Sequence, residues 1–217
     1  MTKGRCNGKR RPQATRRRIL EAGGRLFAAH GFHGVGFRDI AALAHVSLRM
    51  PNHHFGTKER LYAECVRYAL IDRLDFPAIF GDAPVLADAR AARDQIAEKI
   101  RACFFAVHPP SGESSWCGEI LGRALTENLD GALEGFQEGL KPAREWFHAA
   151  IRHLRPHLTQ TEFVLWYGSL WAQVSFFATA RPAILARLGK KRYDVAFMLT
   201  AANHLVHVML QQLETRG

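Results

Sequence analysis

Residues 37 to 61 read FRDIAALAHVSLRMPNHHFGTKERL, and this stretch decides the fold of the chain. It has the layout of a helix, a tight turn, a second short helix and the start of a further helix. Small helical domains that place one helix in the major groove of DNA are built in this way. The stretch therefore predicts a helix-turn-helix.

The distribution of charge favours a polyanionic partner for the same end of the chain. The 217 residues include 30 Lys and Arg against 20 Asp and Glu, a formal net charge of +10. Residues 1 to 60 hold 13 of the basic but only 3 of the acidic residues, so the whole excess lies there. A basic end on a neutral body is expected when only that end neutralises phosphates. The alternative is charge that serves solubility alone.

The first two helices are predicted from capping residues and apolar spacing. Residues 1 to 14 lack apolar periodicity and are expected to form a flexible basic arm. Thr15 is expected to cap the first helix, and Gly31 to end it. The second helix is expected from about Phe37 to Ala44, with Gly36 at its cap. Three of its residues are expected to face inward: Ile40, Ala41 and Leu43.

A third and a fourth helix follow in the same stretch. Ser47 is expected to open the third, which ends near His54 or Phe55. Pro51 lies inside this helix and cannot donate to the Ser47 carbonyl, so we expect a distorted first turn or a late start. Thr57 is expected to cap a long fourth helix that runs toward Pro77.

The rest of the chain is also predicted to be helical, since no segment alternates like a strand. Pro142 is expected to kink or break one helix, and Pro182 to stop another. The chain is therefore expected to be all-α, with a helix-turn-helix domain over 15–60 and a helical domain over 61–217. The further helices are expected at about 85–107, 115–129, 132–155, 159–181 and 193–214.

Cysteine usage and hydropathy predict a cytoplasmic protein without a membrane partner. Cys6, Cys65, Cys103 and Cys117 form no CxxC pair, which is typical of reduced thiols. Residues 163 to 180 carry no charge and reach the lower length limit of a membrane span. We favour instead a helix that packs on its own core with one face and on a partner chain with the other.

Residues 15 to 61 resemble the N-terminal domain of the TetR family of transcriptional repressors. The resemblance implies a ligand-responsive repressor that binds a palindromic operator in double-stranded DNA as a homodimer and is released by a small-molecule effector. The matching segments are TRRRIL (15–20), LFAAHGF (26–32), RDIA (38–41), the Val46–Ser47 pair and HFGTKERLY (54–62).

The third helix is the expected recognition helix, where Arg can read guanine and Asn can read adenine. Its first-turn N–H groups, capped by Ser47, are expected to face a phosphate. Basic residues at the starts of other helices are expected to contact the DNA backbone, or the minor groove in the case of the arm. The alternative for the arm is a solvated tail. The expected DNA-binding residues are Arg16, Arg17, Arg38, Ser47, Leu48, Arg49, Asn52, His53, His54 and Lys58.

Three positions depart from the family pattern. His45 replaces the usual turn glycine at a place that often needs a positive φ, which His tolerates better than bulky residues do. Asn52 and His53 stand where the family often has tyrosines. Together with Pro51 inside the third helix, these departures affect which residues read the bases and not the class of domain.

Two segments of the second domain resemble the C-terminal domain of the CecR-like (YbiH-like) subset: SSWCGEILGRALTE (114–127) and SLWAQVSFFATARPAI (169–184). The resemblance implies a dimer interface and an enclosed effector pocket. The expected interface residues are Ser169, Gln173, Phe176, Leu199, Ala202, Leu205, Val206 and Met209. The expected effector residues are Phe104, His108, Trp116, Arg123, Trp146, Phe147 and Trp166, for each of which ordinary core is the alternative.

Other functional classes remain open or have little support. The 11 histidines leave a metal-sensing or redox-sensing regulator as an alternative, but no Cys or carboxylate lies at a convincing ligand spacing, so no metal or cofactor is expected. No P-loop, GxGxxG, GxSxG or HExxH motif points to an enzyme. A purely architectural DNA-binding protein would explain the charge but not the large neutral domain.

Overall fold

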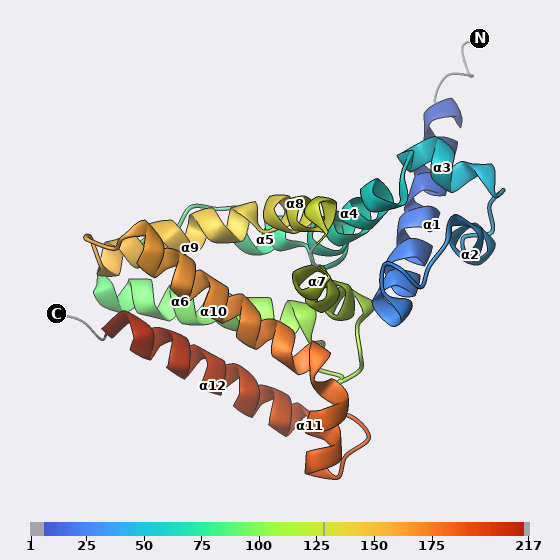
Figure 1. Cartoon of the computed structure of the whole chain (residues 1–217). Coiled ribbons are helices and arrows are strands. Elements are labelled where there is room, and N and C mark those ends of the chain that lie inside the picture. The colour runs from blue at the N-terminus through green and yellow to red at the C-terminus, as the bar shows by residue number, and fades with distance from the viewer. Residues whose placement is uncertain (1–6, 128, 215–217) are drawn as a thin grey trace.

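A computed structural model of the chain describes residues 7–127 and 129–214, and this part is all-α (Figure 1). Helices α1 (Asn7–His30), α2 (Phe37–Leu43) and α3 (Arg49–Phe55) form a head at one end of the molecule. α4 (Lys58–Tyr68) leads from the head into a larger helical body and continues as a π-helical turn, η1 (Ala69–Arg73). The body contains α5 (Phe76–Phe80), α6 (Ala89–Val107), α7 (Trp116–Thr126), α8 (Asp130–Gly139), α9 (Lys141–Leu154), α10 (Gln160–Thr179), α11 (Arg181–Leu188) and α12 (Val195–Glu214). The predicted all-α class is confirmed.

Helix α1 starts further upstream than expected. Because it begins at Asn7, Thr15 lies inside the helix and does not cap it, and residues 7–14 of the expected arm are helical. Residues 1–6 of that arm lie outside the described residues. Five of these eight residues are Lys, Arg, Gln or Ala, whose high helix propensity needs no apolar face, and the helix also contains Pro12. The predicted end is confirmed, since Gly31 follows the helix with φ +73°.

Proline residues break the chain where expected, but each opens a new helix. Pro142 is the second residue of α9, so the helix expected over 132–155 is two helices. Pro182 likewise sits in the first turn of α11, which was not predicted. Pro77 lies in the first turn of α5, and α4 does not reach it because η1 ends at Arg73. A first turn tolerates proline because its N–H groups have no partner within the helix.

Glycines fix α4 closely against the body. Gly131, Gly135 and Gly139 recur every four residues along α8; the first two face α4, and Gly139 faces η1. A Cβ atom at Gly135 would lie 2.4 Å from the carbonyl oxygen of Ala63, and one at Gly139 would lie 2.5 Å from Leu70 Cδ1. The two helices therefore pack backbone to backbone. Because α4 leads from the head into the body, this contact also positions α8 relative to the head.

Helices α6, α10 and α12 run side by side through the body (Figure 1). α10 contains most of the uncharged stretch 163–180 and buries Trp166, Leu170 and Trp171, whereas Leu165 and Phe176 on its outer side remain exposed. Over residues 7–127 and 129–214, no helix combines the length and the hydropathy needed to cross a membrane.

Candidate nucleic-acid interface

The turn between α2 and α3 depends on a left-handed histidine. His45 has φ +51°, and its N–H donates to Ala42 O at 3.2 Å. The N–H of Val46 donates to Ala41 O at 3.0 Å. This pair of bonds is a Schellman motif, in which the left-handed position is usually glycine. The positive φ expected at His45 is therefore confirmed, and this turn sets the angle between the two helices.

Helix α3 begins late, as Pro51 led us to expect. It starts at Arg49 with Leu48 at the N-cap position and no side-chain cap, so the prediction that Ser47 caps it is wrong. The Ser47 carbonyl instead accepts from Met50 N at 2.9 Å, one residue before Pro51. Because Pro51 has no N–H, the first turn offers a phosphate one donor fewer than an ordinary helix does.

The outward face of α3 collects most of the expected base-reading residues. On α2, α3 and the turn between them, six of the predicted DNA-binding residues have exposed side chains, while Pro51 and Phe55 on the opposite face of α3 are buried. Arg49, Asn52 and His53 thus present a guanidinium, an amide and an imidazole together on one face of α3. The six exposed residues are Arg38, Ser47, Leu48, Arg49, Asn52 and His53.

His54 lies on the other side of the helix. Its Nε2 atom is buried without a hydrogen-bond partner. Burial lowers the pKa of His54, with smaller contributions from His53 and Arg16. His54 therefore packs inward as a neutral imidazole and is corrected from a DNA-contact residue to a packing residue.

Three cations expected at the DNA backbone have partners within the chain. The Arg16 guanidinium lies 5.2 Å from the ring centroid of Phe55 and pairs with Glu64. Arg17 Nε donates to the Tyr68 hydroxyl at 3.2 Å. Lys58 Nζ donates to Val35 O at 3.2 Å. These contacts hold the head together, and each cation keeps further N–H donors, with Arg17 itself exposed to solvent.

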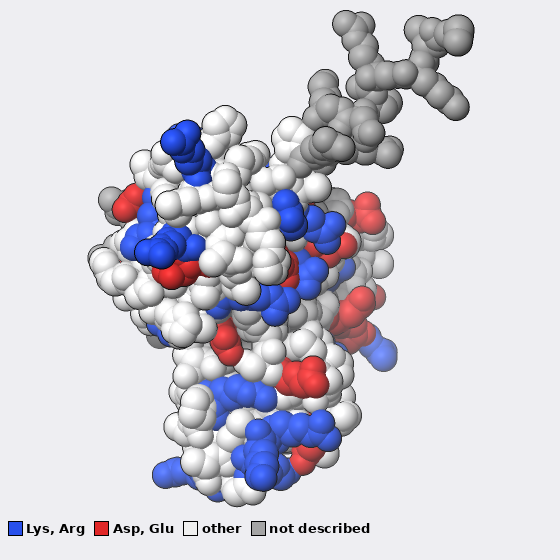
Figure 2. Space-filling view, turned by 90° about the vertical axis from the view of Figure 1, so that its right-hand side faces the viewer, with Lys and Arg blue, Asp and Glu red and all other residues white. Residues whose placement is uncertain are grey.

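The exposed cations of the described head are spread over its surface. Figure 2 views the molecule from the side of the head and shows Lys and Arg scattered over a face that is otherwise mostly uncharged. Arg38 and Arg49 are exposed cations that the structure leaves available to a phosphate or a base. The side chains of the first eleven residues, with five Lys and Arg, lie outside what the structure describes.

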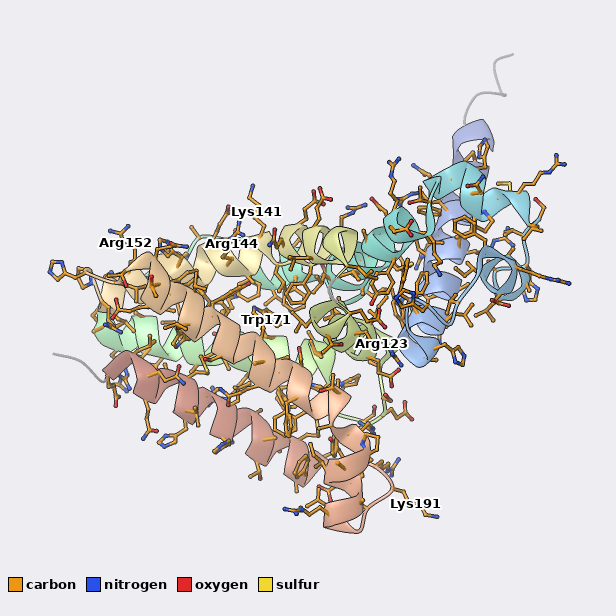
Figure 3. The ribbon with its side chains drawn as sticks, in the orientation of Figure 1. Arg123, Lys141, Arg144, Arg152, Trp171 and Lys191 are labelled. Atoms are coloured by element: carbon orange, nitrogen blue, oxygen red, sulfur yellow. The ribbon has the colours of Figure 1, made fainter. Side chains whose placement is uncertain are left out.

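A charged pair on α7 joins the body to the head. Arg123 donates from Nε to Ala28 O at 2.6 Å and from Nη2 to Ala29 O at 3.0 Å. Glu127, 3.6 Å from Arg123, accepts from the N–H of Phe32 at 3.2 Å. The last carbonyls of a helix lack partners and carry partial negative charge, which a guanidinium satisfies. Arg123 (labelled in Figure 3) therefore caps the end of α1 from the body. The carbonyls of Ala28 and Ala29 are the polar partners that its charge requires.

Trp116 also belongs to this junction. A Cβ atom at Gly24 of α1 would lie 2.2 Å from Trp116 Cζ3, so the six-membered ring of the indole occupies the space beside the helix backbone. On another side Trp116 stacks against Tyr68 of α4, with ring centroids 6.5 Å apart. Trp116 therefore packs between head and body.

The other expected effector residues do not converge on one site. Phe104 and His108 pack with Phe177, and His108 Nε2 lies 2.7 Å from Val174 O. Burial lowers the pKa of His108 to about 4. The Trp166 indole donates to Met209 O at 2.9 Å. Trp146 and Phe147 pack on Phe80 of α5.

Of these residues, Trp146 borders a surface cavity of about 550 Å³ between α5, the following loop and α9. Arg123 and Trp166 line two different cavities. The structure thus divides the predicted effector set between the head–body junction and the aromatic core of the body.

The expected dimer residues also separate into two groups. Phe176 is 54% exposed and Leu199 is 50% exposed, and Ser169 and Gln173 are partly exposed. The remaining four are buried in the chain's own core and are corrected, because this side of α12 packs on α6: Ala202, Leu205, Val206 and Met209. Sequence reasoning missed the exposed apolar residues Val164, Leu165 and Val195, which the helical spacing of α10 and α12 could have indicated.

Metal and redox chemistry find little support in the described residues. Within them, no three His, Cys, Asp or Glu side chains are grouped so that they could hold a metal ion. Cys65, Cys103 and Cys117 are buried free thiols. Burial raises the pKa of the Cys117 thiol to about 11 and that of Cys65 well above its usual value. Protonated, buried thiols are poor redox sensors.

Comparison with known families finds one match. Residues 19–65 match the family described as "Bacterial regulatory proteins, tetR family". This segment runs from the middle of α1 through α2 and α3 into α4, so the match coincides with the head. Comparison with curated protein sequences finds no similar protein.

The whole chain resembles solved structures of transcriptional regulators in fold. FadR from Bacillus subtilis, solved in complex with stearoyl-CoA, aligns with a TM-score of 0.65 and 15% identity over 90% of this chain and 98% of that one. A transcriptional regulator from a Rhodococcus species gives 0.62 and 20% over 90% and 96%. A TetR-family regulator from Mesorhizobium loti gives 0.62 and 15% over 93% and 97%. These relatives are regulators and not enzymes.

Proposed function

We propose that this chain, whose residues 19–65 form a TetR-family N-terminal domain, is a transcriptional regulator that binds a palindromic DNA operator as a homodimer. The observation that carries the proposal is the exposed polar face of α3, held at a defined angle by the Schellman turn at His45. We propose that the protein represses transcription in the cytoplasm and that a small molecule releases it from DNA.

The proposed DNA contacts follow from which side chains are exposed. Arg49 and Asn52 lie exposed on α3 and are the proposed readers of guanine and adenine. His53 and Arg38 are proposed to contact the backbone or a base edge beside them. Lys58 is proposed to act mainly by holding α4 on the head through Val35 O.

The outer faces of α10 and α12 are the proposed dimer interface. Their exposed side chains are almost all uncharged, and they include large apolar residues on α10 and at the start of α12: Leu165, Phe176, Val195 and Leu199. Large exposed apolar patches of this kind mark interaction surfaces. A two-fold axis through this face would place two heads side by side, as a palindrome requires.

The effector is proposed to bind within the body, over residues 61–217. FadR from Bacillus subtilis, which shares the fold, was solved with stearoyl-CoA. In this chain, Arg123 and Glu127 join α7 to the end of α1, so a ligand that moves α7 would also move the head.

Selection of binding sequences from random DNA duplexes tests the proposal. A palindromic consensus with steep salt dependence is the expected result. Arg49→Ala should weaken binding to that consensus by about 1–3 kcal/mol and relax the base preference at one position of the DNA. Arg90→Ala, a change at an exposed arginine of α6, is the matched control and should leave both unchanged. If no consensus emerges, the architectural alternative replaces sequence-specific repression.

A further inference from the structure

The core of the body contains an indole N–H without a partner. Trp171 on α10 is 4% exposed, and its Nε1 atom is buried and makes no hydrogen bond. Trp166, one and a half turns earlier on the same helix, is equally buried but donates to Met209 O. Buried donors are almost always paired, because leaving one unpaired costs stability. Trp171 is therefore an exception that needs a physical reason.

The surroundings of Trp171 are aromatic and hold no carbonyl in line with the donor. Its ring contacts Phe76 of α5, Phe136 of α8 and Tyr167, with centroids 5.5, 6.4 and 6.0 Å away. The Tyr167 hydroxyl donates elsewhere, to Leu140 O at 3.2 Å. Burial raises the pKa of that hydroxyl, and the nearby Trp171 N–H has a smaller, opposite effect. The two groups nevertheless do not meet in hydrogen-bond geometry.

A short helix separates this donor from the surface. Phe76 stacks near Phe80 at 6.0 Å, and Phe80 contacts Trp146 at 6.0 Å. Phe80 and Trp146 line the cavity of about 550 Å³ between α5 and α9. A continuous line of aromatic contacts thus runs from that cavity through α5 to Trp171, which lies inside the body (Figure 3). α5 has only five residues, so few backbone hydrogen bonds resist its displacement.

We propose that this region is the effector site and that α5 is its movable wall. The ligand is a neutral aromatic molecule with one hydrogen-bond acceptor, a carbonyl or a ring nitrogen, which takes the Trp171 N–H. It is neutral because the rings around Trp171 offer no counter-ion, and an unpaired charge is strongly disfavoured in such surroundings. The other rings around Trp171, those of Phe136 and Tyr167, favour stacking with an aromatic ligand over contact with a flexible chain. This inference rests on the proposed function as a ligand-responsive regulator.

Two probes of the same shape test the acceptor directly. Quinoline and naphthalene differ only by a ring nitrogen, and their affinities for the full-length protein without DNA can be measured at neutral pH by ligand-detected NMR. Quinoline should bind about 2- to 10-fold more tightly, the range expected for one net hydrogen bond. Trp171→Phe should abolish this preference, so that quinoline and naphthalene bind with equal affinity.

Trp166→Phe is the matched control, since its N–H already has a partner. It should keep the preference for quinoline. It should also lower the thermal unfolding temperature more than Trp171→Phe does, because only Trp166→Phe removes a hydrogen bond and leaves Met209 O unpaired. A preference that persists in Trp171→Phe, or no saturable binding of either probe, would overturn the proposal.

The wall is tested by Phe76→Ala. Removing this ring opens the route in advance, so both probes should bind roughly threefold or more tightly. Unchanged or weaker binding of both would overturn the role of α5. Because these measurements need no DNA, they separate the two proposals. If quinoline is preferred but no DNA consensus emerges, the proposed regulatory function is wrong and the proposed ligand site stands.

Discussion

The proposed recognition helix α3 and the body helix α10 present their side chains in opposite ways. α3 turns Arg49, Asn52 and His53 to solvent and buries only what holds it on the head. α10 buries its aromatic residues on one side and leaves Leu165 and Phe176 exposed on the other. Polar residues on a surface are free to be selected for contacts with a partner, whereas buried aromatic residues must also fill a core. The residue types of α3 therefore indicate function, and those of α10 do not.

The largest expected effect concerns His108, a buried polar residue of the body. Burial lowers the pKa of His108 from 6.5 to about 4. Between these values the unfolded chain binds a proton that the folded chain does not. The free energy of unfolding should therefore decrease by up to about 3 kcal/mol as the pH is lowered from 6.5 to about 4. His108→Phe should flatten this slope in urea unfolding measured from pH 7 to pH 4 in about half-unit steps. His207→Gln, at an exposed histidine of α12, should retain it.

Close packing between α8 and α4 should give the next largest effect. Gly135→Ala places a methyl group against the Ala63 carbonyl and should lower the free energy of unfolding by about 2 kcal/mol. Gly168→Ala, on the open side of α10, meets no atom within 4 Å and should raise it by up to about 1 kcal/mol. Thermal unfolding compares the two. Equal shifts for both variants would mean that α4 is not packed tightly on the body.

The junction offers a test of how strongly the two regions are connected. Arg123→Ala removes the cap on α1 and should weaken binding to the selected DNA consensus by about 1 kcal/mol, although no DNA contact is lost. Amide exchange in the last turn of α1 should become faster. Arg187→Ala on α11 is the control, because this exposed arginine is far along the chain from the junction. Unchanged affinity and exchange would show that head and body act independently.

The smallest expected effect concerns the start of α10. Backbone and side-chain donation by Thr159, and then Arg155, lower the pKa of Glu162 to about 2. The stabilisation is complete above the ordinary value of 4.5 and is lost as pH falls toward 2. Glu162→Gln should therefore differ from the native chain less at pH 2 than at pH 6 in circular dichroism melts. Glu145→Gln on α9 should show no such pH-dependent difference.

Most of the helices could be predicted from local signals. Thr57 caps α4 by accepting from Arg60 N at 3.2 Å, and Gly36 precedes α2 as expected. The short helices α5 and α11 were missed because five or eight residues give too few turns for a periodic pattern. Leu43 was expected to face inward but is 47% exposed, because α2 ends at that residue and its last turn lies beyond the core.

The candidate site was predictable only where no long-range partner intervened. Exposure of Arg49 and Asn52 follows from the spacing of α3 itself. The roles of Arg16, Lys58 and Arg123 could not be predicted, because each depends on a group many residues away: Glu64, Val35 O and the carbonyls of Ala28 and Ala29. A basic residue in a sequence does not state whether its partner is a phosphate or a carbonyl.

The sequence by itself determined the all-α class, the helix-turn-helix and its late-starting recognition helix, because caps, prolines and apolar spacing act within a few residues. Only the tertiary structure decided which charges remain free, that Arg123 caps the first helix from the other domain, and that Trp171 keeps an unpaired N–H. These properties arise from contacts between segments far apart in the chain, whose geometry depends on how all the helices pack together.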